Sequence, residues 1–400
     1  MYRIKSSFKL NNSNIFFLLW TAYTVLYCLF NSSELVYKYT ILRRFFNFGQ
    51  YGISIILILN IIFLNKYNLK SMLKYLIFAL LSFLMQLNST DMSMLLLTLF
   101  VISAKGIDFK KIIKFDVILK LSMVVIIVGL CLSGFIDNYS AEINGNFKQA
   151  LGFSHPNTFG ALCYIILIEY TIIKLNNMKF IHFVGVWALW YFVLNISGSR
   201  TMGYTFALIY ILLILYKYFP EPFYKLPTKI GFIIVTPLMM VASFFAVKMY
   251  DNKISWAIQL DNILTTRLSS ALKFLKLYDI KLFGQEIETI STRAANMNHT
   301  HTMILDNAYI RGTLMYGLIF MIFLCITYMM LIRYLLKNRK AEYVLFSLYF
   351  IFVGIGESYM INIIFNITML MLIECKFERF SLTDLIKFSK NRRKNGYGKV

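Results

Sequence analysis

Charged residues are scarce in this sequence, and acidic residues are scarcer than basic ones. Asp, Glu, Lys and Arg make up 15% of the 400 residues, whereas 58% are hydrophobic. The length alone would suggest two or three soluble domains, but this composition excludes them. The chain also lacks a Gly-rich phosphate loop and a dinucleotide-binding turn, so we do not expect it to consume a nucleotide.

Cysteine and histidine are rare as well, with five and four residues. The cysteines lie in or beside apolar segments, their number is odd, and none pairs with another at the spacing of a metal site. We therefore interpret them as small packing residues and expect no disulfide framework.

Apolar runs near the length that crosses a bilayer, roughly 20 residues, recur along the whole chain. They predict an all-α polytopic integral membrane protein with about 12 transmembrane helices. The last two segments also fit a re-entrant pair. The expected spans are residues 15–31, 45–64, 73–88, 92–104, 115–136, 151–173, 180–196, 200–219, 230–249, 307–332, 343–357 and 359–374.

The basic residues predict the topology. The net charge of +22 arises mostly in short connections on one side of the predicted membrane, which is typical of cytoplasmic loops. We therefore expect both termini in the cytoplasm and no nucleic-acid partner. Residues 1–14 are basic and precede an apolar run, but no small-residue cleavage site follows, so we expect a retained first helix.

We divide the single membrane domain into four parts. Residues 1–249 form the first nine transmembrane helices, and residues 250–306 form one long extracellular loop with an interfacial helix at 263–278. Residues 307–375 carry the last three transmembrane helices. The basic tail 376–400 is expected to lie against anionic lipid of the inner leaflet.

Two candidate sites stand where the chain enters the membrane from outside. In Gly152–Asn157 (Gly-Phe-Ser-His-Pro-Asn), Pro156 begins a helix and Asn157 fits either a cap or a substrate contact. His155 is placed to touch a polar substrate. Arg200 begins a long apolar helix, where an Arg is costly without a partner. The alternative is that its side chain extends to the outer lipid headgroups. Because basic residues are usually enriched on the cytoplasmic side, an Arg on the outer side is unexpected, and we favour substrate binding.

The long loop supplies the other candidates. Arg267 lies at the border of an apolar helical stripe, and a solvated surface Arg is the alternative. His299 and His301 are candidate general bases because imidazole titrates near neutral pH. Asp306 would orient one of them, and Asn307 would contact substrate; either could also cap the next helix.

A metal site is the alternative role for the two histidines. A His-x-His pair with Asp306 would need a further ligand for zinc, and none is nearby, so we expect no metal. Glu357 lies in an outer hairpin. A polar group at membrane depth suggests a functional role, and hairpin geometry explains it nearly as well.

Four of these motifs, in this order, resemble the superfamily of O-antigen polymerases and ligases. They are Gly152–Asn157, Ser197–Arg200 (Ser-Gly-Ser-Arg), Leu264–Leu268 (Leu-Thr-Thr-Arg-Leu) and Asp306–Tyr309 (Asp-Asn-Ala-Tyr) with Tyr316–Leu318 (Tyr-Gly-Leu). The chain looks most like a Wzy-type polymerase of a Gram-positive capsular or exopolysaccharide locus. The resemblance covers about residues 145–375, and the motifs are short; the residues before them match only in hydrophobicity.

The resemblance implies a glycosyltransferase on the outer face of the bacterial cytoplasmic membrane, without a cofactor. Its substrates would be oligosaccharide repeats on undecaprenyl diphosphate, with membrane lipid, a flippase and a chain-length regulator as partners. Arg200 and Arg267 would hold the departing diphosphate, because a guanidinium matches phosphate oxygens and stays charged. His301, or else His299, would take the acceptor proton.

The chain departs from the family at one position. Family members often have His directly before the Asn that opens the span after the long loop, whereas this chain has Asp306 there. This leaves the identity of the base open. A ligase that uses another acceptor and a flippase or transporter of lipid-linked oligosaccharide also remain open.

Overall fold

The computed structural model describes residues 11–65, 67, 69–143, 146–293, 295, 299 and 301–375. Structural statements below refer to these residues. The basic tail 376–400, for which we predict lipid contact, lies outside them, as do residues 1–10.

Helices dominate this part of the chain, as the apolar runs predict. The α-helices are α1 Asn12–Phe30, α2 Leu35–Lys38, α3 Ile41–Phe63, α4 Leu69–Ser89, α5 Ser93–Ser103, α6 Phe109–Leu132, α7 Pro156–Lys174, α8 Phe180–Ser197, α9 Arg200–Tyr218, α10 Leu226–Asp251, α11 Ser255–Ile263, α12 Arg267–Leu277, α14 Ala308–Tyr316, α15 Leu318–Lys337 and α16 Ala341–Val353. Four short 3-10 helices are η1 Leu175–Asn177, η2 Glu221–Tyr224, η3 Ser358–Met360 and η4 Ile367–Glu374. One antiparallel hairpin pairs β1 Ser140–Ile143 with β2 Asn146–Gln149.

The all-α membrane class is confirmed at this level. Within the described residues, 8 helices are long and apolar enough to cross a membrane. Three further predicted spans correspond to the shorter apolar helices Tyr75–Ser89, Ser93–Ser103 and Ala341–Val353. The predicted span 359–374 is not a regular helix, since turns and the segments η3 and η4 occupy it.

The predicted helix 307–332 is broken, which sequence periodicity does not show. Gly317 separates α14 from α15 with a φ of 99°, in the region that favours glycine. A Cβ at this position would lie 2.2 Å from the carbonyl oxygen of Leu282. The long loop therefore presses its backbone into the break, and the Leu318 amide donates to the Lys281 carbonyl.

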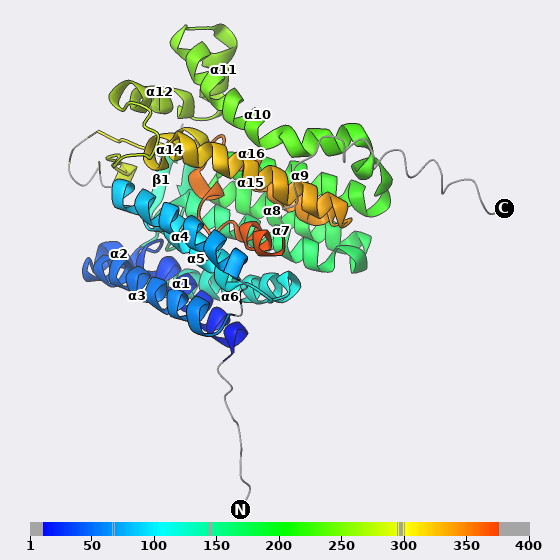
Figure 1. Cartoon of the computed structure of the whole chain (residues 1–400). Coiled ribbons are helices and arrows are strands. Elements are labelled where there is room, and N and C mark those ends of the chain that lie inside the picture. Colours follow the sequence, from blue (N-terminus) through cyan, green and yellow to red (C-terminus); the bar gives the residue numbers. More distant parts are fainter. Residues whose placement is uncertain are drawn as a thin grey trace, which may run out of the picture.

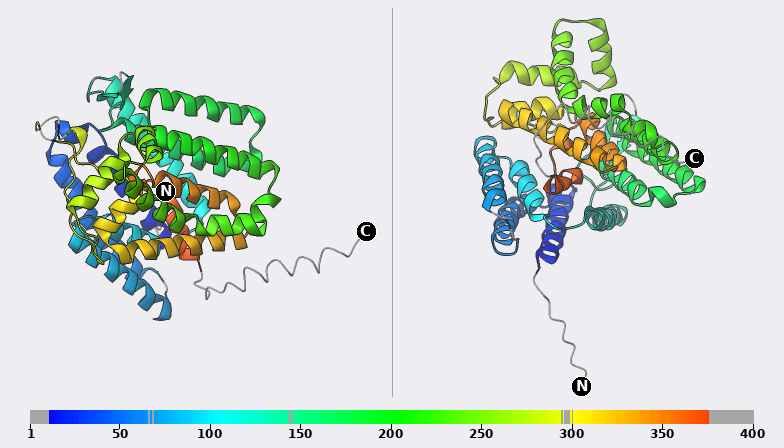
Figure 2. Two further views of the ribbon diagram at one scale, coloured as in Figure 1. Left: turned by 90° about the horizontal axis from the view of Figure 1, so that it is seen from above. Right: turned by 45° about the vertical axis from the view of Figure 1, so that its right-hand side comes forward.

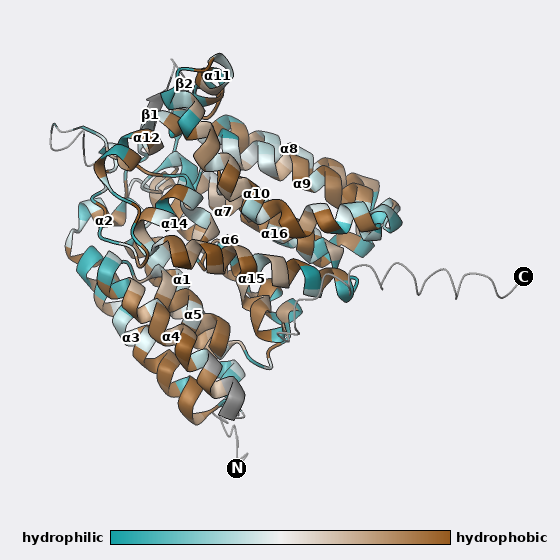
Figure 3. Ribbon diagram, turned by 45° about the horizontal axis from the view of Figure 1, so that its top comes forward, coloured by the Kyte–Doolittle hydropathy of each residue, from teal (hydrophilic) through white to brown (hydrophobic). Residues whose placement is uncertain are grey.

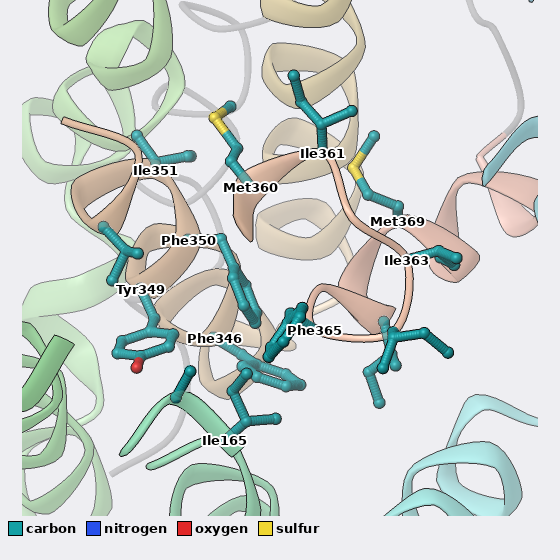
Figure 4. Packing of buried hydrophobic residues seen from close by; sticks show 14 of the residues in the cluster. Ile165, Phe346, Tyr349, Phe350, Ile351, Met360, Ile361, Ile363, Phe365 and Met369 are labelled. Atoms are coloured by element: carbon teal, nitrogen blue, oxygen red, sulfur yellow. The ribbon is translucent and has the colours of Figure 1, made fainter. Parts of the chain in front are cut away.

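The centre of the bundle is α16, whose residues are nearly all buried. A helix that is apolar on every side must be covered on every side. Figure 4 shows Phe346, Tyr349 and Phe350 of α16 packed with Phe365 from the following segment and Ile165 from α7. In Figures 1 and 2, α14–α16 lie between the N-terminal helices and α7–α10.

Both ends of the described core lie at one end of the bundle. The Asn12 side chain donates to the carbonyl oxygens of Ser103 and Lys105. Nearby, Phe109 contacts Tyr343 with ring centroids 5.3 Å apart. Lys340, at the start of the same helix as Tyr343, lies 3.5 Å from Glu374, next to the last described residue. The two limits of the described core therefore lie on the same side of the bundle, whereas the number of crossings and the orientation in a membrane stay predictions.

The opposite end gathers the polar connections. Here α2, the β-hairpin and α12 lie together, at the left of Figure 1. Figure 3 shows hydrophilic residues at this end and hydrophobic residues along the middle of the helices. The candidate site lies here.

Candidate functional site

A cavity of about 1050 Å³ opens among these connections. Its wall comes from β2, the start of α7, the turn between α8 and α9, α12, the end of the long loop and the turn after α16. It combines many cations with few acids, and we call it the cationic cavity. Its basic lining residues are Lys148, Arg200, Arg267, Lys273, Arg293 and Arg311, and its acidic ones are Asp306 and Glu357.

Arg267 bridges the two acids. One guanidinium nitrogen, Nη1, contacts Asp306 Oδ2, and Nη2 donates to Glu357 Oε1 at 2.9 Å. The Glu357 oxygen also accepts from Asn157 Nδ2 at 3.0 Å. The structure thus joins three predicted site residues, Arg267, Asp306 and Asn157, in one network through Glu357, but Asp306 contacts an Arg and not a His as predicted.

Local backbone geometry aims Arg267 into the cavity. Thr265 and Thr266 both have positive φ, 55° and 65°, and they reverse the chain between α11 and α12. The buried carboxylate of Asp261 then accepts from the backbone amides of Leu268 and Ser269. A carboxylate at a helix start satisfies free amides and favours the positive end of the helix dipole. Arg267 is therefore held at the first position of α12.

The amphipathic helix predicted at 263–278 is shorter in the structure, because residues 264–266 form the turn after α11 and only α12, Arg267–Leu277, is helical. Leu268 and Ala271 are buried, whereas Lys273 and Lys276 are exposed. Contact with a lipid surface stays a prediction.

His155 caps α7, a role that the sequence suggested for Asn157. Its Nδ1 accepts from the Asn157 amide at 3.1 Å, and Pro156 occupies the first turn as expected. Burial, with Arg267 and Lys148 nearby, lowers the pKa of His155 to about 4. Its ring is therefore neutral at pH 7, and an imidazole that accepts at Nδ1 carries its proton on Nε2.

The predicted Ser-Gly-Ser-Arg turn brings Arg200 to the rim. Gly198 ends α8 with a φ of 57°, and a Cβ there would lie 2.5 Å from the Lys148 side chain. Lys148 packs over this glycine and donates to its carbonyl oxygen at 3.1 Å. Arg200 then begins α9 with its side chain exposed at the cavity. Because Arg200 has no ion-pair partner among the described residues, its charge is available to a ligand.

His299 and His301, the predicted bases, are not brought to the cavity. Both side chains are exposed, and neither belongs to the described residues that line it. Asn307 is also absent from the lining, because its side chain caps α14 by accepting from the Tyr309 and Ile310 amides. The structure therefore gives Asn307 the capping role that the sequence left open.

Several cavity residues were not predicted as site residues. Lys148 gives no signal in sequence, since it stands in a short polar hairpin. Arg293 contacts Glu34 across the cavity rim and lies 4.0 Å from the Tyr37 ring centroid. Glu357 did give a signal, because a carboxylate beside a buried helix is costly without a partner.

Glu357 has the electrostatics of a tuned carboxyl group. Burial raises its pKa above the ordinary value, while Arg267, the Asn157 hydrogen bond and Lys148 oppose this rise. Its Oε1 accepts both hydrogen bonds, and Oε2 has no hydrogen-bond partner among the described residues. Burial and the neighbouring Arg200 and Arg267 lower the pKa of Lys148.

Within the described residues, no group of three His, Cys, Asp or Glu side chains is arranged to hold a metal ion. Comparison with known proteins gives no family assignment: no family model, no curated protein and no solved structure matches this chain significantly.

Proposed function

We propose that the protein is a polysaccharide polymerase of the bacterial cytoplasmic membrane, which joins oligosaccharide repeats carried on undecaprenyl diphosphate. The observation that carries the proposal is the cationic cavity at one end of an apolar helix bundle. A lipid-linked diphosphate needs this combination, because its tail stays in the bilayer while its charge must be met at the surface. The resemblance of the four motifs to polymerases and ligases supports the same reading.

The diphosphate would lie between Arg200 and Arg267. The Arg267 Nε is buried without a hydrogen-bond partner among the described residues, and a phosphate oxygen is one group that would satisfy it. When the sugar–phosphate bond breaks, negative charge grows on the leaving diphosphate. Guanidinium groups fixed in a partly water-excluded cavity stabilise that charge without rearranging.

Glu357 is better placed than the histidines to act as the base. Its carboxylate lines the cavity beside Arg267, and burial moves its pKa toward the neutral range where a general base works best. In the proposed step, an acceptor hydroxyl attacks the anomeric carbon of the donor sugar. Its proton passes to Glu357, and the bond electrons leave with the lipid diphosphate. A single displacement of this kind inverts the anomeric centre.

The test uses full-length protein in detergent with one lipid-linked repeat as the only substrate. A ladder of longer lipid-linked chains is the expected product. Release of lipid diphosphate only after another acceptor is added would identify a ligase. Absence of both products from correctly folded protein would contradict the proposal.

A transporter is the second candidate, and one observation favours it. Lys120 of α6 lies between Asp116 of the same helix and Glu169 of α7, and all three side chains are 0% exposed. Ionisable groups inside a membrane often mark a transport route. Turnover of donor in detergent, where no two compartments exist, separates the two candidates.

A further inference from the structure

A second cavity, of about 510 Å³, adjoins the first. Arg311 and Tyr359 line both cavities, and Ser358 lines the second just beyond Glu357. The short segment 357–359 therefore separates the two spaces. The rest of the wall comes from α1, α3, the start of α5 and α14, so N-terminal helices outside the motif resemblance build most of it.

The chemistry of this wall differs from that of the cationic cavity. Arg311 is its one basic residue and Asp91 its one acidic residue among the described lining. Aromatic rings and carboxamides make up most of the remaining lining. The rings are Tyr23, Tyr27, Phe46, Tyr51, Tyr316 and Tyr359, and the carboxamides are Asn31, Asn47, Gln50 and Asn362. We call this space the tyrosine cavity.

Part of the wall is held in place by hydrogen bonds. Asp91 Oδ1 accepts from the Tyr316 hydroxyl at 3.0 Å and from the Ser93 amide at 2.7 Å. Asn362 Nδ2 donates to the Tyr27 hydroxyl at 3.0 Å. Such supports fix rotamers before a ligand arrives, which lowers the cost of binding.

Other polar groups in the same wall remain unused. Asn31 and Asn47 form no side-chain hydrogen bond with another described residue, although each carboxamide offers two donors and an acceptor. The cavity volume lies within the range of ligand pockets, about 300–1,000 Å³. A sugar ring suits this wall, because its hydroxyl groups pair with carboxamides and its C–H face packs on aromatic rings.

We propose that the tyrosine cavity binds the acceptor sugar, an uncharged or weakly charged hexose at the end of a glycan. The near balance of charge argues against a second phosphate site. A sugar held here lies next to the segment 357–359, at the boundary with the cavity that Glu357 lines. The assignment of the bound sugar to the acceptor glycan, and not to the donor, rests on the proposed function. The proposal that the cavity binds a sugar rests only on its lining residues.

The experiment measures by calorimetry how tightly two probes bind to full-length protein in lipid nanodiscs. The first is a lipid-free oligosaccharide of one repeat, released by mild acid from the lipid-linked pool of the same cells. The second is inorganic pyrophosphate, which reports on the cationic cavity. We compare wild type with Gln50→Ala and Asn47→Ala in the tyrosine cavity, with Arg267→Ala in the cationic cavity, and with Asn195→Ala, whose exposed carboxamide lies on α8.

We expect each set of variants to weaken the binding of one probe and not of the other. Gln50→Ala and Asn47→Ala each weaken oligosaccharide binding about five- to tenfold, as loss of one hydrogen bond predicts, and leave pyrophosphate binding unchanged. Arg267→Ala does the reverse, and Asn195→Ala changes neither. Because Asn47 is exposed, its variant decides the question if the buried Gln50 proves necessary for folding.

Two outcomes overturn the inference: wild type that does not bind the oligosaccharide, or cavity variants that bind it as wild type does. The proposed function fails separately. If the variants affect the two probes separately but lipid-linked repeats are never joined, the sugar site is supported and the polymerase function is contradicted.

Discussion

Two clusters in this molecule share one composition, a cation between two carboxylates, and differ in their surroundings. Arg267 contacts Asp306 and Glu357 at the wall of a 1050 Å³ cavity. Lys120 contacts Asp116 and Glu169 inside the bundle, where no side chain of the three is exposed. The Trp20 ring nitrogen closes this second cluster by donating to Asp116 Oδ1 at 2.9 Å.

The difference separates two uses of charge. In the interior cluster each carboxylate contacts the Lys120 ammonium, but Glu169 Oε2 is buried without a hydrogen-bond partner among the described residues. None of the three residues lines a described cavity. In the cavity cluster, Arg267 Nε and Glu357 Oε2 have no hydrogen-bond partner within the described part of the chain, and an open volume lies beside them. Charge alone therefore does not mark a site in this protein; unsatisfied charge beside an open volume does.

The largest expected effect is on stability and concerns the interior cluster. Lys120→Met would leave two buried carboxylates without their cation, and breaking a buried pair in this way costs about 3–5 kcal/mol. Denaturation in detergent would show a lower unfolding midpoint, partly restored by adding Glu169→Gln. If Lys120→Met left the unfolding midpoint unchanged but abolished transport of lipid-linked oligosaccharide, the cluster would have a functional role and the transporter candidate would be strengthened.

The next effect is on activity and concerns the cavity cluster. Arg267→Ala should lower chain growth at least a hundredfold, since removing one such donor costs about 3 kcal/mol in the transition state. Arg267→Lys should lower chain growth nearly as much, because a single ammonium group cannot replace the parallel N–H donors of a planar guanidinium. Lipid-linked single repeats should accumulate. Normal long polymer from Arg267→Ala would exclude this residue from the reaction.

Glu357→Gln tests the base within the same cluster. The amide keeps the size and part of the hydrogen bonding but cannot take a proton, so activity should fall about a hundredfold, the low end for general base catalysis. Because only the carboxylate accepts a proton, wild-type activity should rise with pH through the raised pKa of Glu357. A variant that keeps the wild-type pH profile would argue against this base.

Glu34 and Arg293 form an intermediate case at the cavity rim. Burial raises the pKa of Glu34 from 4.5 to about 7, although Arg293 opposes the rise. A carboxyl whose folded pKa lies above its unfolded value adds stability at low pH and loses it as pH rises toward 7. Between pH 5 and 8 the melting temperature of wild type should fall relative to that of Glu34→Gln by about 1–2 °C, because a loss of about 1 kcal/mol shifts the melting temperature of a long chain less than that of a small domain. A constant difference across this range would contradict the buried, titrating Glu34.

The smallest effect is expected outside both clusters. His301→Ala should change activity less than about twofold, since exposed substitutions away from a site are usually near neutral. A hundredfold loss in His301→Ala, with Glu357→Gln active, would restore the histidine as the base and indicate that the loop moves onto the substrate.

Sequence patterns predicted the helices well because hydropathy is a local property. Runs of apolar residues mark what must leave water, and Pro156 marks where a helix begins. The breaks were missed because their cause is distant: Gly317 reads as one glycine in an apolar run, and only contact with the backbone near Leu282 shows why the helix stops.

The sequence by itself determined a membrane-embedded helical chain and a polar end that carries Arg200, Arg267 and His155. Tertiary structure decided which groups meet there. It brought Lys148 and Glu357 to Arg267, kept His299 and His301 outside, and opened a second cavity from helices without a recognisable motif. Hydrophobicity acts without direction, so composition reveals it, whereas ion pairs and cavities depend on which helices pack together, and no single stretch of sequence contains that information.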